Sequence, residues 1–203
     1  MNTLVKKDYT TLIRHLPEVH SYIKANLSEK RYLHSLRVAR VSAFLCRREG
    51  LPAISGHLAG LSHDMARELS DELILDYAGR IGYKRDDTYD SVVLLHGMAG
   101  RYILAKMFGV VDEDVLSAVE HHTLGHPKLT LLGKIVFCAD YIEPGRDYIS
   151  FEKYNSFISM PLNDMVVSVV DDCRKRGYKI HPITQMMIDN IVFLREACVD
   201  QKG

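Results

Sequence analysis

Apolar residues recur at helical spacing along most of this chain, and short polar or glycine-containing breaks separate the periodic segments. The first clear segment follows Ser28, runs through Leu33, Leu36 and Leu45, and stops at Gly50. Serine is common directly before the first turn of a helix, and glycine is common directly after the last turn. The pattern therefore predicts a helix that begins after Ser28 and ends at Gly50.

The same signals predict further helices over residues 55–67, 71–79, 90–108, 112–123, 162–176 and 182–199. The segment 131–142 is ambiguous, because the β-branched and aromatic residues of KIVFCA would also suit a buried strand. Leu132, Val136 and Ala139 nevertheless recur at helical spacing, and Pro144 follows them, so a helix is predicted here too. Since no repeat or linker-like stretch interrupts the pattern, residues 1–203 are predicted to form a single all-α domain.

The composition narrows the classes of protein to which the chain can belong. Its 203 residues are enough for one domain with a sizeable core, and its 26 basic and 26 acidic side chains balance. No overall field then attracts nucleic acid or an anionic membrane. The first ten residues lack an apolar signal core, and no apolar run approaches the roughly 20 residues that span a bilayer. The four cysteines have neither metal-site nor disulfide spacing, so they are predicted to be buried, reduced thiols of a cytoplasmic protein.

Six side chains that can bind a metal are spread over the predicted helices. They are His34, His63, Asp64, His96, His122 and Asp140. Each histidine taken alone is more often an ordinary interior or surface residue than a ligand. As a set, however, they bring imidazole and carboxylate ligands to the core of a helical bundle from different helices. This mixture favours iron, manganese, zinc or cobalt over calcium and magnesium, which prefer oxygen ligands alone.

Asp64 can serve two metals, because each of its carboxylate oxygens can bind one. Two metals roughly 3.5–4 Å apart activate water for attack on phosphorus, so the set predicts hydrolysis of a phosphate ester or anhydride. His121 competes with His122 for a place in the set, since neighbours on a helix point about 100° apart. The other histidines outside the set are predicted to face solvent or to lie on a loop surface, namely His15, His20, His57 and His126.

Several segments resemble one family of known proteins. They are RYLHSLRVA, LSHDMARE, LLHGMAG, VEHHTLG, KIVFCADYIEPGR and GYKIHPIT, and they extend from about Lys30 to Thr184. In these segments the chain is similar to the YqeK-type branch of the HD-domain phosphohydrolases, and HHTLG and ADYIEPGRD are the most specific of them. The resemblance implies a single all-α HD-domain bundle with a binuclear metal centre. Its motif-bearing core would cover about 28–146, with C-terminal helices over 160–200.

The resemblance also implies two metal sites that share Asp64. The ligands of the first are His34, His63, Asp64 and Asp140, and those of the second are Asp64, His96 and His122. His122 is preferred to His121, because in the family a His-Thr-x-Gly segment supplies the ligand. The family usually holds iron in both sites, and manganese, cobalt and zinc suit the same ligands.

Four residues are candidates for contacts with the phosphates of a substrate. Arg67 lies one turn after the His-Asp pair and Arg146 just past the helix of Asp140, and guanidinium groups match phosphate oxygens bidentately. Lys134 lies nearly two turns before Asp140, and His181 either contacts the substrate or caps the last helix. A solvated surface cation is the plainer interpretation of each basic residue. The predicted catalytic residues are Asp64, Arg67 and Arg146, and the predicted nucleotide-binding residues are Arg67, Lys134, Arg146 and His181.

The ligand set and the resemblance together predict a metal-dependent hydrolase that cleaves diadenosine tetraphosphate symmetrically into two molecules of ADP. One alternative is hydrolysis of another nucleotide, such as a nucleoside monophosphate, a nucleoside diphosphate or a cyclic nucleotide. A second alternative is a non-catalytic domain that senses metal or nucleotide, although such a domain would not need all six ligands. The expected partner is a small nucleotide rather than nucleic acid or a membrane, and a homodimer is left open.

Overall fold

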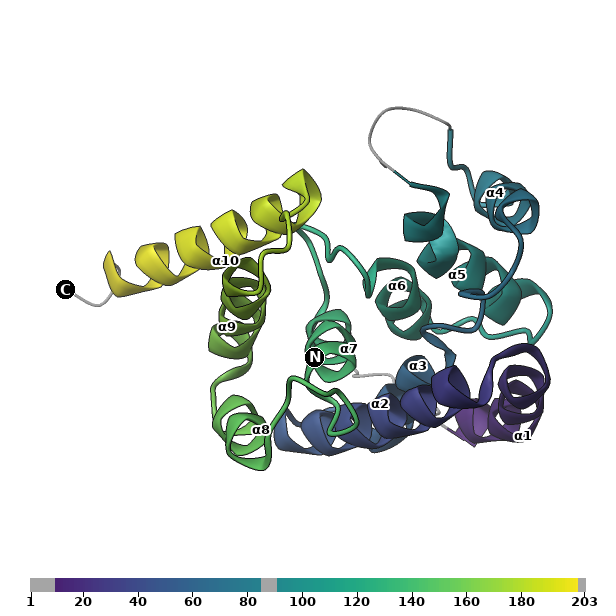
Figure 1. Ribbon diagram of the computed structural model, residues 1–203, viewed down its shortest axis with the longest axis horizontal. Helices are drawn as coiled ribbons and strands as arrows, with labels where there is room; N and C mark the ends of the chain where they lie inside the picture. Colours follow the sequence, from purple (N-terminus) through teal and green to yellow (C-terminus); the bar gives the residue numbers. More distant parts are fainter. Residues whose placement is uncertain (1–9, 85–90, 201–203) are drawn as a thin grey trace, which may run out of the picture.

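The computed structural model describes residues 10–84 and 91–200, with side chains to residue 194. Within these ranges the chain forms ten α-helices and one short 3-10 helix and contains no β-strand, which confirms the all-α class. The helices are α1 (Thr10–Asn26), α2 (Glu29–Arg48), α3 (Ala53–Ser62), α4 (Asp71–Arg80), η1 (Val92–Leu95), α5 (His96–Lys106), α6 (Glu113–His121), α7 (Leu131–Ile142), α8 (Phe151–Ile158), α9 (Leu162–Lys175) and α10 (Pro182–Asp200) (Figure 1).

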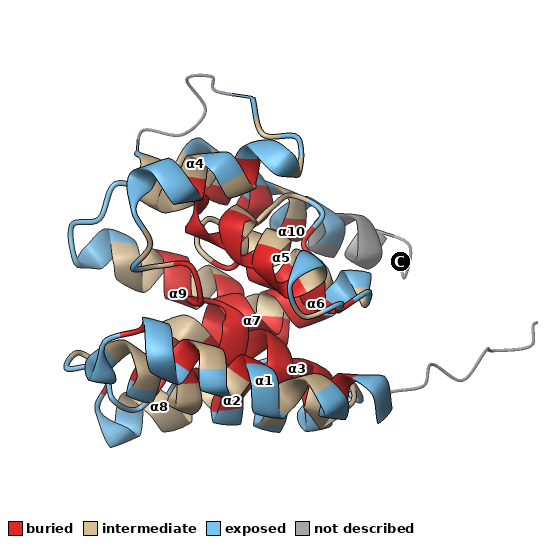
Figure 2. Cartoon of the chain, turned by 90° about the vertical axis from the view of Figure 1, so that its right-hand side faces the viewer, coloured by how far each residue is buried: buried red, intermediate tan, exposed pale blue. Residues whose placement is uncertain are grey.

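Helix α7 lies at the centre of the molecule, where it packs against α2, α3, α6 and α9 (Figure 1). Eight of its twelve residues are buried, and Figure 2 shows buried residues gathered in α7 and the helices around it. A helix that is buried on most sides carries apolar residues on most sides, and several of those in α7 are β-branched or aromatic, types that also suit a buried strand. This is why 131–142 also resembles a strand. The predicted helix is nevertheless confirmed over the same residues, and Thr130 Oγ1 caps it by accepting from Gly133 N at 3.1 Å.

Helices α2 and α3 form a closely packed pair, because glycines on α3 allow the backbones to approach. A Cβ atom built on Gly56 would lie 2.5 Å from the carbonyl oxygen of Ser42, and one on Gly60 would lie 2.9 Å from the Cα atom of Ala39. Any side chain at these positions would force the two helices apart. The pairing brings a residue of α2, His34, close to the residues that follow α3.

Two predicted helices differ from the structure by more than two residues at one end. Helix α3 ends at Ser62 rather than at residue 67, and residues 63–68 form turns with bonds such as Met65 N to Ser62 O at 3.1 Å. The helix predicted over 90–108 begins at His96, after the 3-10 helix, and ends at Lys106; residue 90 lies outside the described residues. In both cases the main chain turns at a candidate ligand, which orients that side chain inward. Helices α1 and α8 were not predicted.

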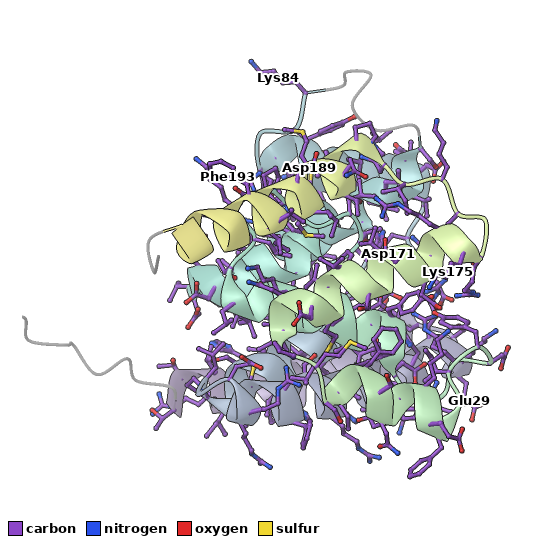
Figure 3. All side chains as sticks on the ribbon, turned by 90° about the vertical axis from the view of Figure 1, so that its left-hand side faces the viewer. Glu29, Lys84, Asp171, Lys175, Asp189 and Phe193 are labelled. Atoms are coloured by element: carbon purple, nitrogen blue, oxygen red, sulfur yellow. The ribbon has the colours of Figure 1, made fainter. Side chains whose placement is uncertain are left out.

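The C-terminal helices α8, α9 and α10 lie on one side of the molecule, away from α4 and α5 (Figure 1). Figure 3 looks onto this side, where Lys175 of α9 and Phe193 of α10 are exposed. Among the cysteines, Cys46 and Cys138 are buried, Cys173 is partly buried, and all three are free thiols. The side chain of Cys198 lies outside the described part of the chain, as do residues 1–9, on which most of the signal-peptide prediction rests. No helix within the described ranges is long and apolar enough to cross a membrane.

Candidate metal centre

The fold brings all six predicted ligands into one cluster from five separate segments. Four histidines and one aspartate are buried, and Asp140 is partly exposed. Their positions are His34 on α2, His63 and Asp64 in the turn after α3, His96 at the first residue of α5, His122 directly after α6, and Asp140 on α7. The cluster therefore depends on contacts between helices that are far apart in the sequence.

The four histidine rings are anchored through their Nδ1 atoms. His63, His96 and His122 each donate from Nδ1 to the main-chain carbonyl three residues earlier, at 2.7, 2.5 and 2.8 Å. His34 donates from Nδ1 to the carboxylate of Glu143 at 3.0 Å. In the neutral form that binds a metal an imidazole has only one N–H, so in that form these bonds leave each Nε2 atom as an acceptor that points into the cluster.

The first ligand group consists of His34, His63, Asp64 and Asp140. The Nε2 atoms of His34 and His63 lie 3.2 Å apart, and Asp140 Oδ1 lies 3.0 Å from His34 Nε2 and 3.7 Å from His63 Nε2. Asp64 Oδ2 approaches His63 Nε2 to 3.7 Å. His63 thus lies close to an oxygen of each carboxylate and to the Nε2 atom of His34.

The second ligand group consists of Asp64, His96 and His122. The Nε2 atoms of His96 and His122 lie 3.0 Å apart, and Asp64 Oδ1 lies 3.0 Å from the former and 3.7 Å from the latter. Thr123 Oγ1 lies 3.1 Å from His122 Nε2 at the edge of the group. Asp64 thus faces the first group with Oδ2 and the second with Oδ1, which is the arrangement that a bridging carboxylate needs.

The donor atoms fit divalent metal ions. Two pairs of imidazole nitrogens face each other at about hydrogen-bond distance, although their Nδ1 bonds leave no proton between them. Such lone pairs repel unless a cation lies close to both. Burial also lowers the pKa of His63 to about 4, so this ring is neutral near pH 7, the form that binds a metal.

Both carboxylates of the cluster are ionised. Burial alone would raise the pKa values of Asp64 and Asp140, because it disfavours the charged form. The surrounding imidazoles outweigh that effect, with Arg146 adding to it at Asp140, and they hold both pKa values well below the usual range. The centre therefore offers anionic oxygens from both aspartates beside the neutral nitrogen of His63, a combination that suits transition metals.

The model of the HD domain matches residues 31–145, the stretch that contains all six predicted ligands. The chain belongs to the HD-domain hydrolases. The symmetrical bis(5′-nucleosyl)-tetraphosphatase of Halalkalibacterium halodurans is 31% identical over 80% of this chain and 89% of that protein. The protein of the same name from Bacillus subtilis is 29% identical, over 75% of this chain and 82% of that one.

A solved structure supports the same placement. The crystal structure of a "predicted HD superfamily hydrolase involved in NAD metabolism" from Clostridium acetobutylicum is 34% identical, with a TM-score of 0.76 over 87% of this chain and 96% of that chain. These matches confirm the resemblance to the YqeK-type branch. HD domains bind divalent metals, in agreement with the two ligand groups. The domain match ends before α8, so the single domain over 1–203 stays a prediction.

Glu143 holds His34 in place through its Nδ1 atom, on the side of the ring away from the ligand cluster of this HD-domain hydrolase. The sequence analysis did not identify this residue. Its side chain is 1% exposed, accepts from His34 Nδ1, and forms an ion pair with Arg37 and a hydrogen bond with Gly145 N at 2.7 Å. Burial alone would raise its pKa, but these donors lower it to about 2. The available signal was a glutamate three residues after Asp140, directly after the end of an apolar helix.

Three arginines line a cleft of about 170 Å³ at the metal centre, together with Thr123 and four of the ligands. Arg67 and Arg146 were predicted to lie here. Arg67 Nη1 donates to Val93 O at 3.3 Å and lies 3.1 Å from His96 Nδ1, so it stands beside the second ligand group. Arg146 Nη2 lies 3.4 Å from His34 Nε2, so it stands beside the first group.

Arg31 is the third arginine of the cleft, and sequence analysis did not identify it. Its Nη1 atom donates to Asp64 Oδ2 at 2.8 Å, and its Nε atom lies 3.2 Å from Glu68 Oε1. Glu68 also accepts from the main-chain N–H and the hydroxyl of Ser28, which ties the start of α2 to the turn that carries Asp64. The signal for Arg31 was its position one turn before His34 on the same helix.

Two predicted substrate contacts do not reach the cleft. Lys134 lies on α7, but its ammonium group donates to Asn163 Oδ1 of the neighbouring α9 at 2.9 Å. Nearly two turns of helix carry its side chain to a different face of α7 from Asp140. His181 Nδ1 accepts from Ile183 N at 3.2 Å, so its ring occupies the start of α10. This is the capping role that was the alternative interpretation of His181.

The histidines that were predicted to lie on the surface are only partly exposed, namely His15, His20, His57 and His126. His121 does not join the cluster: its ring stacks on His126 with centroids 4.7 Å apart, and burial lowers its pKa to about 4. Neither ring is fully exposed. His20 Nε2 lies 2.8 Å from the hydroxyl of Tyr32, and burial lowers the pKa of His57. The structure therefore brings His122, and not His121, to the metal centre.

Proposed function

We propose that this HD-domain hydrolase cleaves dinucleoside tetraphosphates symmetrically and releases two nucleoside diphosphates. The observation that carries the proposal is the arrangement of the cleft, in which two ligand groups meet at Asp64 and an arginine stands beside each group. A substrate with a nucleoside diphosphate on both sides of the cleaved bond needs cationic partners on both sides. The names of the bacillary relatives favour the same substrate.

The first ligand group would hold one divalent metal and the second would hold another, with Asp64 shared. We propose iron as the usual metal, and manganese, cobalt and zinc suit the same donors. When bound, such a pair supplies Lewis acidity toward phosphoryl oxygens and a water nucleophile near neutral pH.

The arginines bind and orient the polyphosphate. Arg31, Arg67 and Arg146 outnumber the two carboxylates of the cleft even before any metal is counted, so the cleft attracts an anionic substrate. Guanidinium groups bind phosphate oxygens bidentately and offset the charge that develops on the leaving diphosphate. Asp64, Arg67 and Arg146 are therefore the residues that we assign to catalysis.

The cleft is too small for the whole substrate. A volume of about 170 Å³ is below the roughly 300 Å³ at which pockets for whole drug-sized ligands begin. Part of a dinucleoside tetraphosphate must therefore lie outside the cleft. We place the phosphates at the arginines and the ligand groups, and a cytoplasmic nucleotide pool is the expected source of the substrate. The free thiols of Cys46 and Cys138 agree with that reducing compartment.

Product analysis tests the proposal. Metal-loaded protein given diadenosine tetraphosphate should yield ADP as the sole nucleotide product, and a single turnover in ¹⁸O-water should label one of the two ADP molecules. ATP plus AMP would contradict symmetrical cleavage. Rapid hydrolysis of mononucleotides, cyclic nucleotides or NAD, with the tetraphosphate untouched, would contradict the substrate assignment.

Arginine variants test the roles within the cleft. Arg67→Ala and Arg146→Ala should each lower kcat/KM for the tetraphosphate by about 10- to 100-fold, and lower it less for a simple aryl phosphate, which has fewer oxygens to bind. Arg80→Ala is the matched control, because Arg80 forms an exposed ion pair with Asp76 on α4. Metal content is measured in parallel, since Arg146 also contacts Asp140. Equal losses on both substrates would contradict a role in binding the polyphosphate.

A further inference from the structure

A second pocket shares Arg146 with the metal cleft and has a similar volume, about 170 Å³. We call it the side pocket. Its lining includes Lys30 and Arg37 of α2, and Glu143, Arg146, Asp147 and Tyr148 from the end of α7 and the loop after it. The whole substrate does not fit in the metal cleft, and the side pocket is an adjoining space for the part that lies outside it.

Lys30 is the most exposed of the three cations that line the side pocket. Arg37 is held in an ion pair with Glu143, and Arg146 also lines the metal cleft. Lys30 is exposed, and no ion pair or hydrogen bond joins its side chain to another residue in the described part of the chain. An ammonium group without a carboxylate partner can bind a phosphate at little cost, because no protein partner has to be displaced.

Tyr148 provides a rigid aromatic wall. The guanidinium carbon of Arg176 lies 3.4 Å from the centre of its ring, and Tyr141 packs against it with centroids 5.1 Å apart. These contacts hold the ring in place, and the ring also lines the side pocket. A ring that is already immobilised can stack on a base with little further loss of conformational freedom.

Asp147 is a carboxylate next to this wall, and it also lines the side pocket. Its side chain is exposed and has no cationic partner among the described residues. A carboxylate repels phosphates, but it accepts hydrogen bonds from a pair of ribose hydroxyls, as the acidic residue of dinucleotide-binding folds does. The side pocket therefore offers a cation, a carboxylate and an aromatic ring, which match the phosphate, ribose and base of a nucleotide.

We infer that the side pocket binds the nucleoside end of one half of the substrate, with Lys30 on the phosphate nearest the ribose, Asp147 on the ribose hydroxyls and Tyr148 against the base. This inference rests on the proposed function for the identity of the substrate. Lys30, Asp147 and Tyr148 are specificity-determining residues in this arrangement. They do not touch the reacting phosphorus.

Fluorescence tests the role of Tyr148, because the chain contains no tryptophan. Tyr148→Trp introduces a single indole in the wall of the side pocket, and titration of the metal-loaded variant with ADP should change its emission in a saturable way. Phe193→Trp is the control, since Phe193 is 66% exposed on α10, and its emission should not respond. A saturable signal from the control alone, or from neither variant while ADP binds by calorimetry, would overturn the assignment.

Binding of ADP to the metal-loaded variants tests the other two residues. Lys30→Ala should weaken ADP about tenfold, whereas Lys106→Ala should leave it unchanged, because Lys106 lies ten residues, about 15 Å, along α5 from His96. Asp147→Asn should weaken ADP severalfold but should not weaken 2′,3′-dideoxy-ADP, which lacks the ribose hydroxyls.

Different results would contradict the side pocket and the proposed function. Wild-type ADP affinity in both Lys30→Ala and Asp147→Asn, with ADP still formed from the tetraphosphate, would overturn the side pocket and leave the proposed function. The predicted binding losses without any hydrolysis of the tetraphosphate would support the side pocket and overturn the proposed function.

Discussion

Replacement of Glu143 by glutamine tests whether a buried carboxylate holds the metal centre in place. Glu143 receives hydrogen bonds from His34, Arg37 and Gly145 while only 1% of it is exposed. These donors outweigh burial and lower its pKa from the ordinary 4.5 to about 2. Glutamine has nearly the same shape and keeps an oxygen acceptor, but it has no charge for Arg37 and His34.

The size of the effect follows from the pKa shift. The lowering of the pKa from 4.5 to about 2 corresponds to about 3 kcal/mol in favour of the ionised side chain in the folded state. A carboxylate with a lowered pKa stabilises the fold above pH 4.5, and this stabilisation is lost as the pH falls toward 2. By pH 3 more than half of it should be gone. We therefore expect Glu143→Gln to lower the free energy of unfolding by about 2–3 kcal/mol at pH 7, and by less than half as much at pH 3.

Urea unfolding of the metal-free protein, followed by circular dichroism at both pH values, measures these differences. Glu113→Gln is the control, because the side chain of Glu113 is 72% exposed in its ion pair with Arg101, and its loss should stay within about 0.5 kcal/mol. A loss at Glu143 that is as large at pH 3 as at pH 7 would refute the electrostatic explanation, and so would no loss at pH 7. In the metal-loaded protein the same variant should bind metal about 10–100-fold more weakly, since Glu143 orients His34.

Two further predictions concern the metals. Protein purified without oxygen should contain about two transition-metal ions per chain, and Asp64→Ala should lower the content of both sites; elemental analysis that finds only traces, with no recovery of activity on adding iron or manganese, would contradict a binuclear centre. His122→Ala should lose metal and most activity, whereas His121→Ala should change both by less than the roughly 10–100-fold that a supporting residue can cost; equal losses would contradict the geometry of α6.

The sequence alone determined most of the helices, because local physical rules set their ends. Asp112 was predicted to open α6, and its Oδ1 atom accepts from two N–H groups of the first turn. Gly50 was predicted to end α2, and it has a φ of 75°, in the left-handed region that favours glycine. Where the rule was weaker the bounds were wrong: apolar spacing extended α3 past Ser62, since it cannot distinguish a buried turn from a buried helix.

The candidate ligands were also visible in the sequence, because few residue types bind transition metals and their order resembles a known family. Their meeting at one point was not visible. Only the packing of α2, α3, α5, α6 and α7 decided that two groups share Asp64, and only the turn of the chain at the end of α6 decided that His122 faces Asp64 while His121 stacks on His126.

The tertiary structure alone identified Arg31 and Glu143 and excluded Lys134 from the cleft. Basic and acidic residues are usually solvated, and nothing in the local sequence tells whether a long side chain turns toward a site or away from it. Arg31 reaches Asp64 while the same guanidinium group pairs with Glu68. Lys134 instead bonds to Asn163, because α9 packs against that side of α7. Local rules determine where helices begin and end and which residues can do chemistry, whereas contacts between distant segments determine which of them meet.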